Sequence, residues 1–144
     1  MLRQKRESIE WLEFEIFQEF PQISHGIFLK NGGLSVGQVG GGDVQQARLN
    51  RNRIKELMQC STLEAGYQVH GAEVREVPLE REDVRCDALF TTKEDVGLLI
   101  KHADCQAAII YDPIENVIAN VHAGWSGNVQ NIYAALVDNL KRRF

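Results

Sequence analysis

The 144 residues carry a formal net charge of −4 at pH 7, and 44% of them are hydrophobic and 25% charged. This balance predicts one globular domain over residues 1–144 and gives no electrostatic reason to expect nucleic acid or a membrane as partner. No apolar run approaches the roughly 20 residues of a membrane helix. Three cysteines at unrelated spacings favour a reducing cytoplasm over a disulfide framework.

The first thirty residues predict two strands. Leu12, Phe14 and Ile16 alternate with glutamates, which is the period of a half-buried strand, and Pro21 ends that strand. A second strand is expected over residues 26–30, before an Asn-Gly-Gly turn.

A glycine-rich segment and a helix follow. Six glycines within residues 32–42 predict a flexible loop, because they lack the ordered spacing of a phosphate-binding motif. Asp43 can cap a helix that runs to about Cys60, with apolar residues at helical spacing. The opposite face of this helix is predicted to be solvated and carries Arg48, Arg51 and Lys55.

Residues 66–91 predict short strands joined by an exposed, charged connection. Gly71 interrupts a valine-rich strand pattern, which indicates a bulge that could re-aim the neighbouring His70. A short strand is expected over residues 88–91.

The stretch from Gly97 to Asn128 organises the rest of the chain. It contains three short apolar runs bounded by turn signals, which predict buried strands. These strands would bring Asp104, Cys105 and His122 to one edge of a sheet, where a thiol and an imidazole can bind zinc or act as nucleophile and base. The runs are residues 97–100, 107–111 and 117–121.

The chain ends in a predicted helix, residues 128–144, that packs on the sheet through one apolar stripe. The stripe is formed by Val129, Ile132, Tyr133, Leu136, Val137 and Leu140.

Histidine and cysteine side chains could supply the ligands of a metal ion. One cysteine and two histidines form the ligand set of a catalytic zinc that keeps a fourth position open. A single histidine is more often structural than a ligand, and spacing alone does not select two of the four. They are His25, His70, His102 and His122.

Several motifs, in order along the chain, resemble the YfiH-like family, which is also called the laccase-domain or polyphenol oxidoreductase family and includes proteins of purine nucleoside phosphorylase type. The resemblance implies an α+β fold with mixed β-sheets in a layered α/β/β/α sandwich and a metal site at one end. It implies that zinc is held by His70, Cys105 and His122. The motifs are HGIF at 25–28, GGLS at 32–35, Asn52-Arg53, QVHG at 68–71, DALFT at 87–91, ADC at 103–105 and VHAGWSG at 121–127.

The resemblance also implies the reactions. These are phosphorolysis of adenosine, inosine, guanosine and methylthioadenosine, and hydrolytic deamination of adenosine, so the partners would be a purine nucleoside and phosphate. Asp104, the only acid inside the motif core, is the candidate for moving protons in deamination; the alternative is a buried, hydrogen-bonded turn residue. Trp125 and Tyr133 could stack on a purine, although aromatic residues at such positions more often belong to the core.

The chain departs from the family pattern at two substrate-binding positions. Lys30 stands where the family usually has Arg, which keeps a positive charge but loses the bidentate guanidinium fork. Ser126 stands where the family has Arg after HAGW, so an anion contact would be lost. The family domain usually continues beyond Phe144, which predicts a truncated member whose exposed surfaces favour a homo-oligomer.

The sequence bears on three other functions. A true multicopper oxidase is disfavoured, because four histidines and two methionines are too few for its copper centres. A metal-free hydrolase would use Cys105 as nucleophile, activated by His122 or His70. A non-catalytic binding or assembly member would explain Lys30, Ser126 and the early end. The favoured prediction is a cytoplasmic zinc-dependent purine nucleoside phosphorylase.

Overall fold

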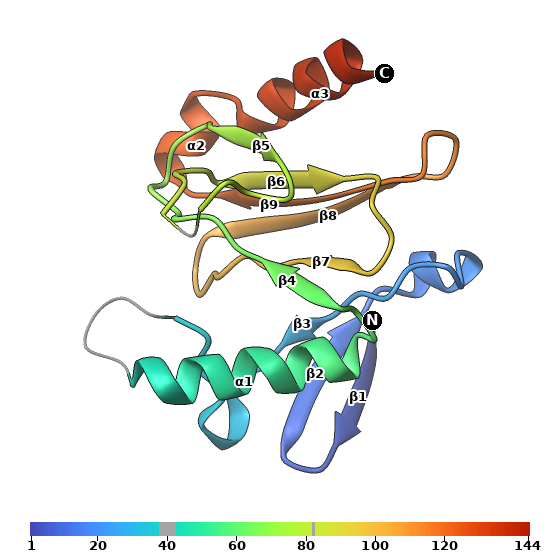
Figure 1. Ribbon diagram of the computed structural model, residues 1–144, viewed down its shortest axis with the longest axis vertical. Helices are drawn as coiled ribbons and strands as arrows, with labels where there is room; N and C mark the ends of the chain where they lie inside the picture. The colour runs from blue at the N-terminus through green and yellow to red at the C-terminus, as the bar shows by residue number, and fades with distance from the viewer. Residues whose placement is uncertain (38–42, 82) are drawn as a thin grey trace. The chain divides into compact units, whose positions relative to one another are not determined.

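The computed structural model describes residues 1–37, 43–81 and 83–144 (Figure 1). The chain forms two compact units, a first unit, Met1–Cys60, and a second unit, Ser61–Phe144. The predicted α+β class with a mixed sheet is confirmed. Residues 38–42 of the predicted glycine-rich loop lie outside the described residues. No described helix combines the length and hydrophobicity needed to cross a bilayer.

The first unit is built on a three-stranded antiparallel sheet in the order β1-β2-β3. The predicted first strand corresponds to β2 but ends at Glu13, because a 3-10 helix, η1, takes up the rest of the alternating pattern. The predicted second strand shortens to β3, and a 3-10 turn, η2, follows it. The elements are β1 (Leu2–Arg6), β2 (Ile9–Glu13), η1 (Glu15–Glu19), β3 (Ile27–Phe28) and η2 (Asn31–Gly33).

Strand β1 was not predicted, because its sequence LRQKR is charged and lacks an apolar period. Its basic side chains are paired across the sheet: Arg3 and Lys5 both form ion pairs with Glu10 on β2. Opposite charges on neighbouring strands stabilise an edge strand that buries little apolar surface.

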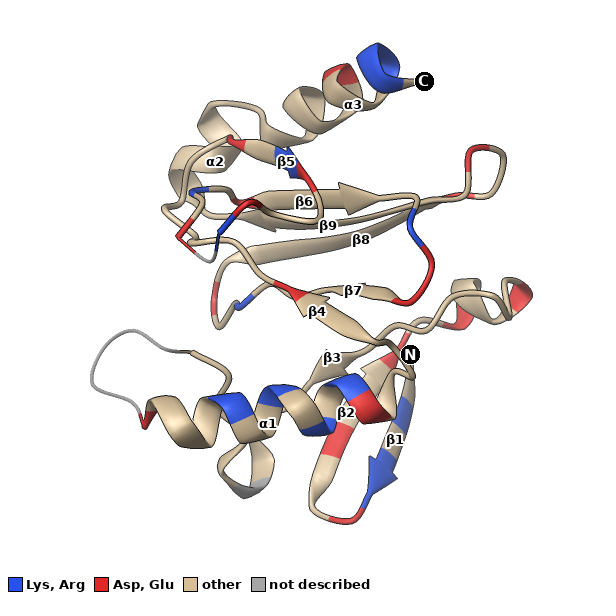
Figure 2. Ribbon diagram, in the orientation of Figure 1, with Lys and Arg blue, Asp and Glu red and all other residues tan. Residues whose placement is uncertain are grey.

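The predicted helix is confirmed as α1 (Val44–Leu57). Asp43 caps it, since its carboxylate accepts hydrogen bonds from the backbone N–H groups of Gln45 and Gln46 at 2.9 and 3.1 Å. Basic residues recur along this helix, as the blue segments of its ribbon show (Figure 2). Arg51 differs from the prediction of a purely solvated residue, because it is only half-exposed and donates to the carbonyl of Val36 at 3.0 Å.

The second unit contains a mixed four-stranded sheet in the order β5-β6-β9-β8, in which only β5 and β6 are parallel. A separate parallel pair joins β4 and β7. The strands predicted from the apolar runs are present as β6, β7, β8 and β9, shifted by at most two residues. The bounds are β4 (Thr62–Glu64), β5 (Val74–Glu76), β6 (Ala88–Thr91), β7 (Val96–Leu98), β8 (Gln106–Asp112) and β9 (Val117–Ala123).

Both faces of this sheet are covered within the second unit (Figure 1). On one face, Ile132 and Leu136 of helix α3 (Ile132–Arg143) are 0% exposed and pack against Val121. On the other face, Leu89 contributes to a second cluster that includes side chains of β7. Helix α3, the mixed sheet and the β4–β7 pair therefore form successive layers.

The predicted C-terminal helix is interrupted. A short helix, α2 (Trp125–Val129), precedes α3, and Asn131 between them has a left-handed backbone with φ 56°. The Asn131 side chain accepts from the backbone N–H of Ala134 and so caps α3. Trp125 is 82% exposed, so the expectation that it belongs to the core was wrong, whereas Tyr133 packs against the core.

In the first unit, His25 contacts Phe14, directly before η1, and Phe17, within η1. Its Nε2 accepts a hydrogen bond from the backbone N–H of Phe14 at 2.8 Å. The ring stacks on Phe14 and meets Phe17 edge-on, with centroids 6.1 and 4.8 Å apart. Desolvation lowers the pKa of His25, and the charge of Glu13 only partly opposes this.

We therefore expect the first unit to lose stability as the pH falls below about 6.5, the ordinary pKa of histidine. In that range the unfolded chain takes up a proton that the folded chain does not, so the free energy of unfolding decreases; above it the contribution is complete. Urea unfolding at pH 7.5 and 5.5 would measure this, using the fluorescence of Trp11 in a Trp125→Phe background. His25→Gln, which keeps an acceptor that does not titrate, should reduce the pH dependence, and an undiminished dependence in that variant would contradict the assignment.

Candidate metal centre

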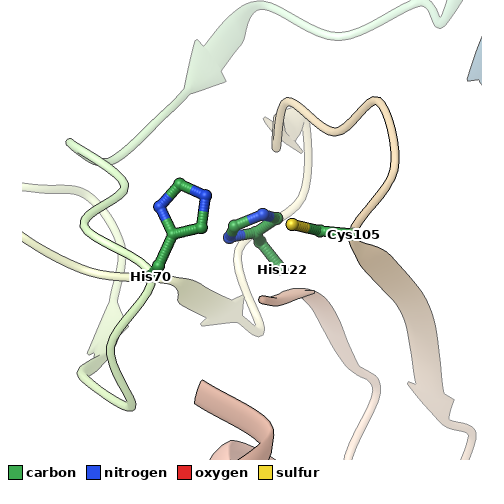
Figure 3. A group of neighbouring side chains, drawn as sticks. All are labelled: His70, Cys105 and His122. Atoms are coloured by element: carbon green, nitrogen blue, oxygen red, sulfur yellow. The ribbon is translucent and has the colours of Figure 1, made fainter. Parts of the chain in front are cut away.

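Three side chains from separate parts of the second unit meet at one end of the mixed sheet (Figure 3). One nitrogen each of His70 and His122 and the sulfur of Cys105 all lie within 4.8 Å of one another. His122 is on β9, and Cys105 directly precedes β8. Because Ala107 pairs with His122 across these antiparallel strands, the cysteine is held beside the imidazole. His70 comes from the loop between β4 and β5.

Asp87, directly before β6, is the residue that connects these parts. It is 1% exposed, and its carboxylate Oδ1 lies 2.8 Å from Nδ1 of His122. The same carboxylate accepts hydrogen bonds from the backbone N–H groups of Val69, His70 and Gly71 at 3.1, 3.0 and 2.9 Å. With Nδ1 of His122 occupied in this way, Nε2 is the nitrogen left to bind an ion.

The predicted bulge at Gly71 is wrong, because residues 69–71 form a loop wrapped around the Asp87 carboxylate and not a strand. His70 has a left-handed backbone with φ 61°, which directs its ring toward His122; the two ring centroids are 4.8 Å apart. Few non-glycine residues adopt this conformation, and the surrounding hydrogen bonds hold it in place.

Glycines of the VHAGWSG segment allow this loop to approach closely. A Cβ added at Gly124 would lie 2.7 Å from the His70 ring, and one added at Gly127 would lie 2.6 Å from the carbonyl oxygen of Gly71. A side chain at either position would push against the loop that carries His70.

The three donors fit a metal ion. Two imidazoles and one thiolate are preferred ligands of zinc, and an ion bonded to all three would hold the donor atoms roughly 3.3 to 3.7 Å apart. The donor atoms here lie within 4.8 Å of one another, so binding an ion would draw them closer together. Among the described residues, this is the one group of three or more histidine, cysteine and acidic side chains that could hold an ion.

The Cys105 thiol is protonated more readily than usual. Partial burial is the largest cause of its raised pKa, and the Asp104 carboxylate adds to it through its charge and through a hydrogen bond with the thiol. Asp104 itself is exposed, so the alternative of a buried turn residue was wrong. A bound cation would counter both effects by favouring the thiolate.

The two predicted substrate-binding residues are not members of this group. Lys30 is exposed and belongs to the first unit, directly before η2. Ser126 is half-buried in α2, where its Oγ accepts from the side-chain amide of Gln130 at 2.8 Å. A role for either residue in binding substrate stays a prediction.

No role was predicted for Asp87, the first residue of the DALFT motif. A signal was available, because an acidic residue directly before a short, largely apolar strand is expected to be buried, and a buried carboxylate needs partners. The identity of those partners could not be read from the sequence, since they lie 16 to 35 residues away.

A family model described as multi-copper polyphenol oxidoreductase laccase matches residues 23–144. A purine nucleoside phosphorylase of Bacteroides thetaiotaomicron is 27% identical, over 92% of this chain and 57% of its own length. A purine nucleoside phosphorylase of Pseudomonas aeruginosa is 35% identical, over 68% of this chain and 40% of its own length. The chain thus spans about half the length of the curated relatives it matches.

Solved structures show the same fold. The hypothetical protein YfiH of Bacillus licheniformis matches 94% of this chain and 57% of its own, with a TM-score of 0.77 and 24% identity. YlmD of Geobacillus stearothermophilus matches 97% of this chain and 58% of its own, with a TM-score of 0.73 and 22% identity. At these identities the comparison supports the fold and not a shared activity.

The glycine contacts give a matched pair of variants. Gly127→Ala should displace the loop that carries His70 and weaken metal binding by roughly tenfold or more, because its new Cβ meets a backbone oxygen. Gly71→Ala should bind metal as wild type, because its Cβ would meet its nearest neighbour at an ordinary 3.6 Å. Zinc affinity measured by competition with a chromophoric chelator distinguishes them, and equal affinities in the two variants would refute the role given to Gly127.

Proposed function

This chain belongs to the multi-copper polyphenol oxidoreductase laccase family, and from that premise we propose that it is a zinc-dependent purine nucleoside phosphorylase. The zinc ligands would be His70, Cys105 and His122. Deamination of adenosine and phosphorolysis of methylthioadenosine are proposed as further activities of the same site. We place the reaction in the cytoplasm, because three cysteines at unrelated spacings favour a reducing compartment over a disulfide framework.

The observation that carries this proposal is the convergence of two imidazoles and one thiol within 4.8 Å, with one imidazole already bonded to a buried carboxylate. An isolated pair of histidines would be weak support, because histidines often serve structural roles. A thiol and an oriented imidazole beside them are the donor chemistry of zinc sites. The relatives named purine nucleoside phosphorylase support the substrate class.

The copper chemistry in the family's description does not suit these residues. Multicopper oxidases need several histidine-rich centres, whereas this chain has four histidines and two methionines. His25 is engaged with Phe14 in the first unit, which leaves three histidines for any metal chemistry in the second unit. One zinc ion accounts for the donors with fewer assumptions.

In phosphorolysis, a phosphate oxygen forms a bond to the anomeric carbon of the sugar as the bond from that carbon to the purine nitrogen breaks, and the purine takes up a proton. When bound, a zinc ion would supply positive charge that keeps the Cys105 thiol ionised and would polarise an oxygen of the substrate or of phosphate. The residues of the chain itself would bind and orient the phosphate and the nucleoside. Lys30 is proposed to offset phosphate charge, and Ser126 to offer a hydroxyl in place of a guanidinium.

In deamination, water adds to the purine ring carbon that bears the amino group, and ammonia leaves. Asp104 is proposed to move the protons, because it is exposed and lies next to Cys105. Asp104→Asn should therefore reduce adenosine deamination more than inosine phosphorolysis, since the second reaction does not add water. Product analysis of the two reactions would measure the difference.

Two alternatives remain distinct from this proposal. The hydrolase hypothesis needs a reactive thiolate at Cys105. The raised pKa of that thiol opposes this hypothesis, because it favours the protonated form. The binding or assembly hypothesis rests on the replacements at Lys30 and Ser126. A homo-oligomer would suit that hypothesis, and light scattering of the purified chain at micromolar concentration would test it.

We expect about one equivalent of zinc in the purified chain and purine release from inosine or adenosine that requires phosphate. Cys105→Ala should lose the zinc and reduce purine release by more than roughly 100-fold, because one of three ligands is removed. Cys60→Ala, which changes a cysteine outside the three donors, should retain both. Metal analysis and chromatographic detection of free purine are the measurements.

The other outcomes separate the alternatives. A chain without metal whose Cys105 reacts rapidly with iodoacetamide would favour the hydrolase. Bound zinc without purine release from any tested nucleoside would favour the binding or assembly member, and the proposed activity would then be wrong.

A further inference from the structure

We propose that Asp87 is a positioning residue that controls both histidines of the metal centre, by fixing the proton of His122 on Nδ1 and by holding the backbone of His70. The inference deepens the proposed function and rests on it only for the identity of the bound ion. Its physical basis, the hydrogen bonding of one carboxylate, is independent of any substrate.

The carboxylate of Asp87 is fully used by donors. Oδ1 faces Nδ1 of His122 and the backbone N–H of His70, and Oδ2 accepts from the N–H groups of Val69 and Gly71. An ionised carboxylate accepts about four hydrogen bonds and donates none, so these four donors saturate it. No buried side-chain polar atom in the described part of the chain lacks a partner.

This saturation determines the tautomer of His122. The three backbone groups can only donate, and the carboxylate that receives them has no proton to give. The contact of 2.8 Å with His122 is therefore a bond in which Nδ1 carries the proton. Nε2 of the neutral ring must then hold a lone pair, which is what a metal ligand needs.

The same carboxylate determines where His70 lies. His70 has φ 61°, and the N–H groups on both sides of it and its own N–H all end on Asp87. A left-handed residue is held only when surrounding contacts over-determine its conformation. Because His70 reaches Asp87 through its backbone and His122 through its ring, one side chain positions both imidazoles. Burial of Asp87, at 1% exposure, keeps water from replacing either set of bonds.

The substitution Asp87→Asn separates this role from simple packing, because it preserves shape and changes hydrogen bonding. An amide has one accepting oxygen and an NH₂ group that can only donate. If the amide oxygen takes the Oδ2 position, it keeps the N–H groups of Val69 and Gly71, and the NH₂ faces Nδ1 of His122 and the N–H of His70. The His122 proton then moves to Nε2, which removes the lone pair needed for the ion. If the amide turns round, the N–H groups of Val69 and Gly71 lose their acceptor and the loop that carries His70 is released.

The first experiment is NMR of the wild-type chain without metal, at a pH where the imidazoles are neutral. Two-bond proton–nitrogen correlations report the tautomer of each ring. We expect His122 to be protonated on Nδ1, and exposed His102, which serves as the reference, to favour Nε2. Protonation of His122 on Nε2 in the wild type would overturn the proposal without any variant having to fold.

The second experiment uses the metal as probe. Asp87→Asn should shift the His122 tautomer or release the 69–71 amides to rapid hydrogen exchange, and should weaken zinc binding by roughly 10- to 100-fold. Asp112→Asn is the matched control, because the Asp112 carboxylate also accepts two backbone N–H groups, those of Ile114 and Glu115, but contacts no imidazole. Wild-type tautomer, amide protection and zinc affinity in Asp87→Asn would refute the proposal.

These readouts do not involve turnover, so the two proposals can fail separately. A chain with His122 protonated on Nδ1 that binds zinc and releases no purine would support the role of Asp87 and refute the proposed activity. A chain that phosphorolyses nucleosides but has His122 protonated on Nε2 would support the proposed activity and refute the role of Asp87.

Discussion

The second unit depends on a buried carboxylate, that of Asp87, which forms no ion pair with a lysine or arginine among the described residues. Asp87 receives three backbone N–H groups and one imidazole, and these four polar contacts replace the water that an ion loses on burial. An acid left without such partners would be strongly destabilising. The arrangement of the 69–71 loop, the start of β6 and the end of β9 follows from the need to supply them.

The sheet and the centre depend on each other through register. Ala88 pairs with Val121, which places Asp87 next to His122, and the backbone N–H of His122 donates to the carbonyl of Asp87 at 2.7 Å. Side chains carried by paired strands hold their separation better than side chains on free loops. His70, which lies in the loop between β4 and β5, is held by hydrogen bonds from the backbone of residues 69–71 to Asp87.

Elements with a strong local period could be predicted from the sequence. The apolar runs gave β6, β8 and β9 to within two residues, and Asp43 with its helical spacing gave α1. Elements held by pairing with distant residues could not. Strand β1 is charged, and its basic side chains find Glu10 on β2. The break at Asn131 depends on one left-handed residue inside an otherwise helical stripe.

Part of the metal centre could be predicted from the sequence for the same reason. Cys105 and His122 follow from strand ends, so their proximity could be argued from the apolar runs alone. His70 could not be chosen among the remaining histidines by spacing and came from family resemblance, because its position is set by a loop conformation. Trp125 could not be placed correctly from the sequence. Its position beside a strand end favoured the core, but it is the first residue of α2, where its side chain is 82% exposed.

The sequence separation between Asp87 and His122 has a consequence for assembly. These residues are 35 positions apart and meet only when β6 has paired with β9, so the unfolded chain lacks the hydrogen bond that orients His122 toward an ion. An ion captured there would bind the folded second unit alone and would shift its folding equilibrium by mass action. Cells short of that ion would then hold less folded protein, and its abundance would report metal supply.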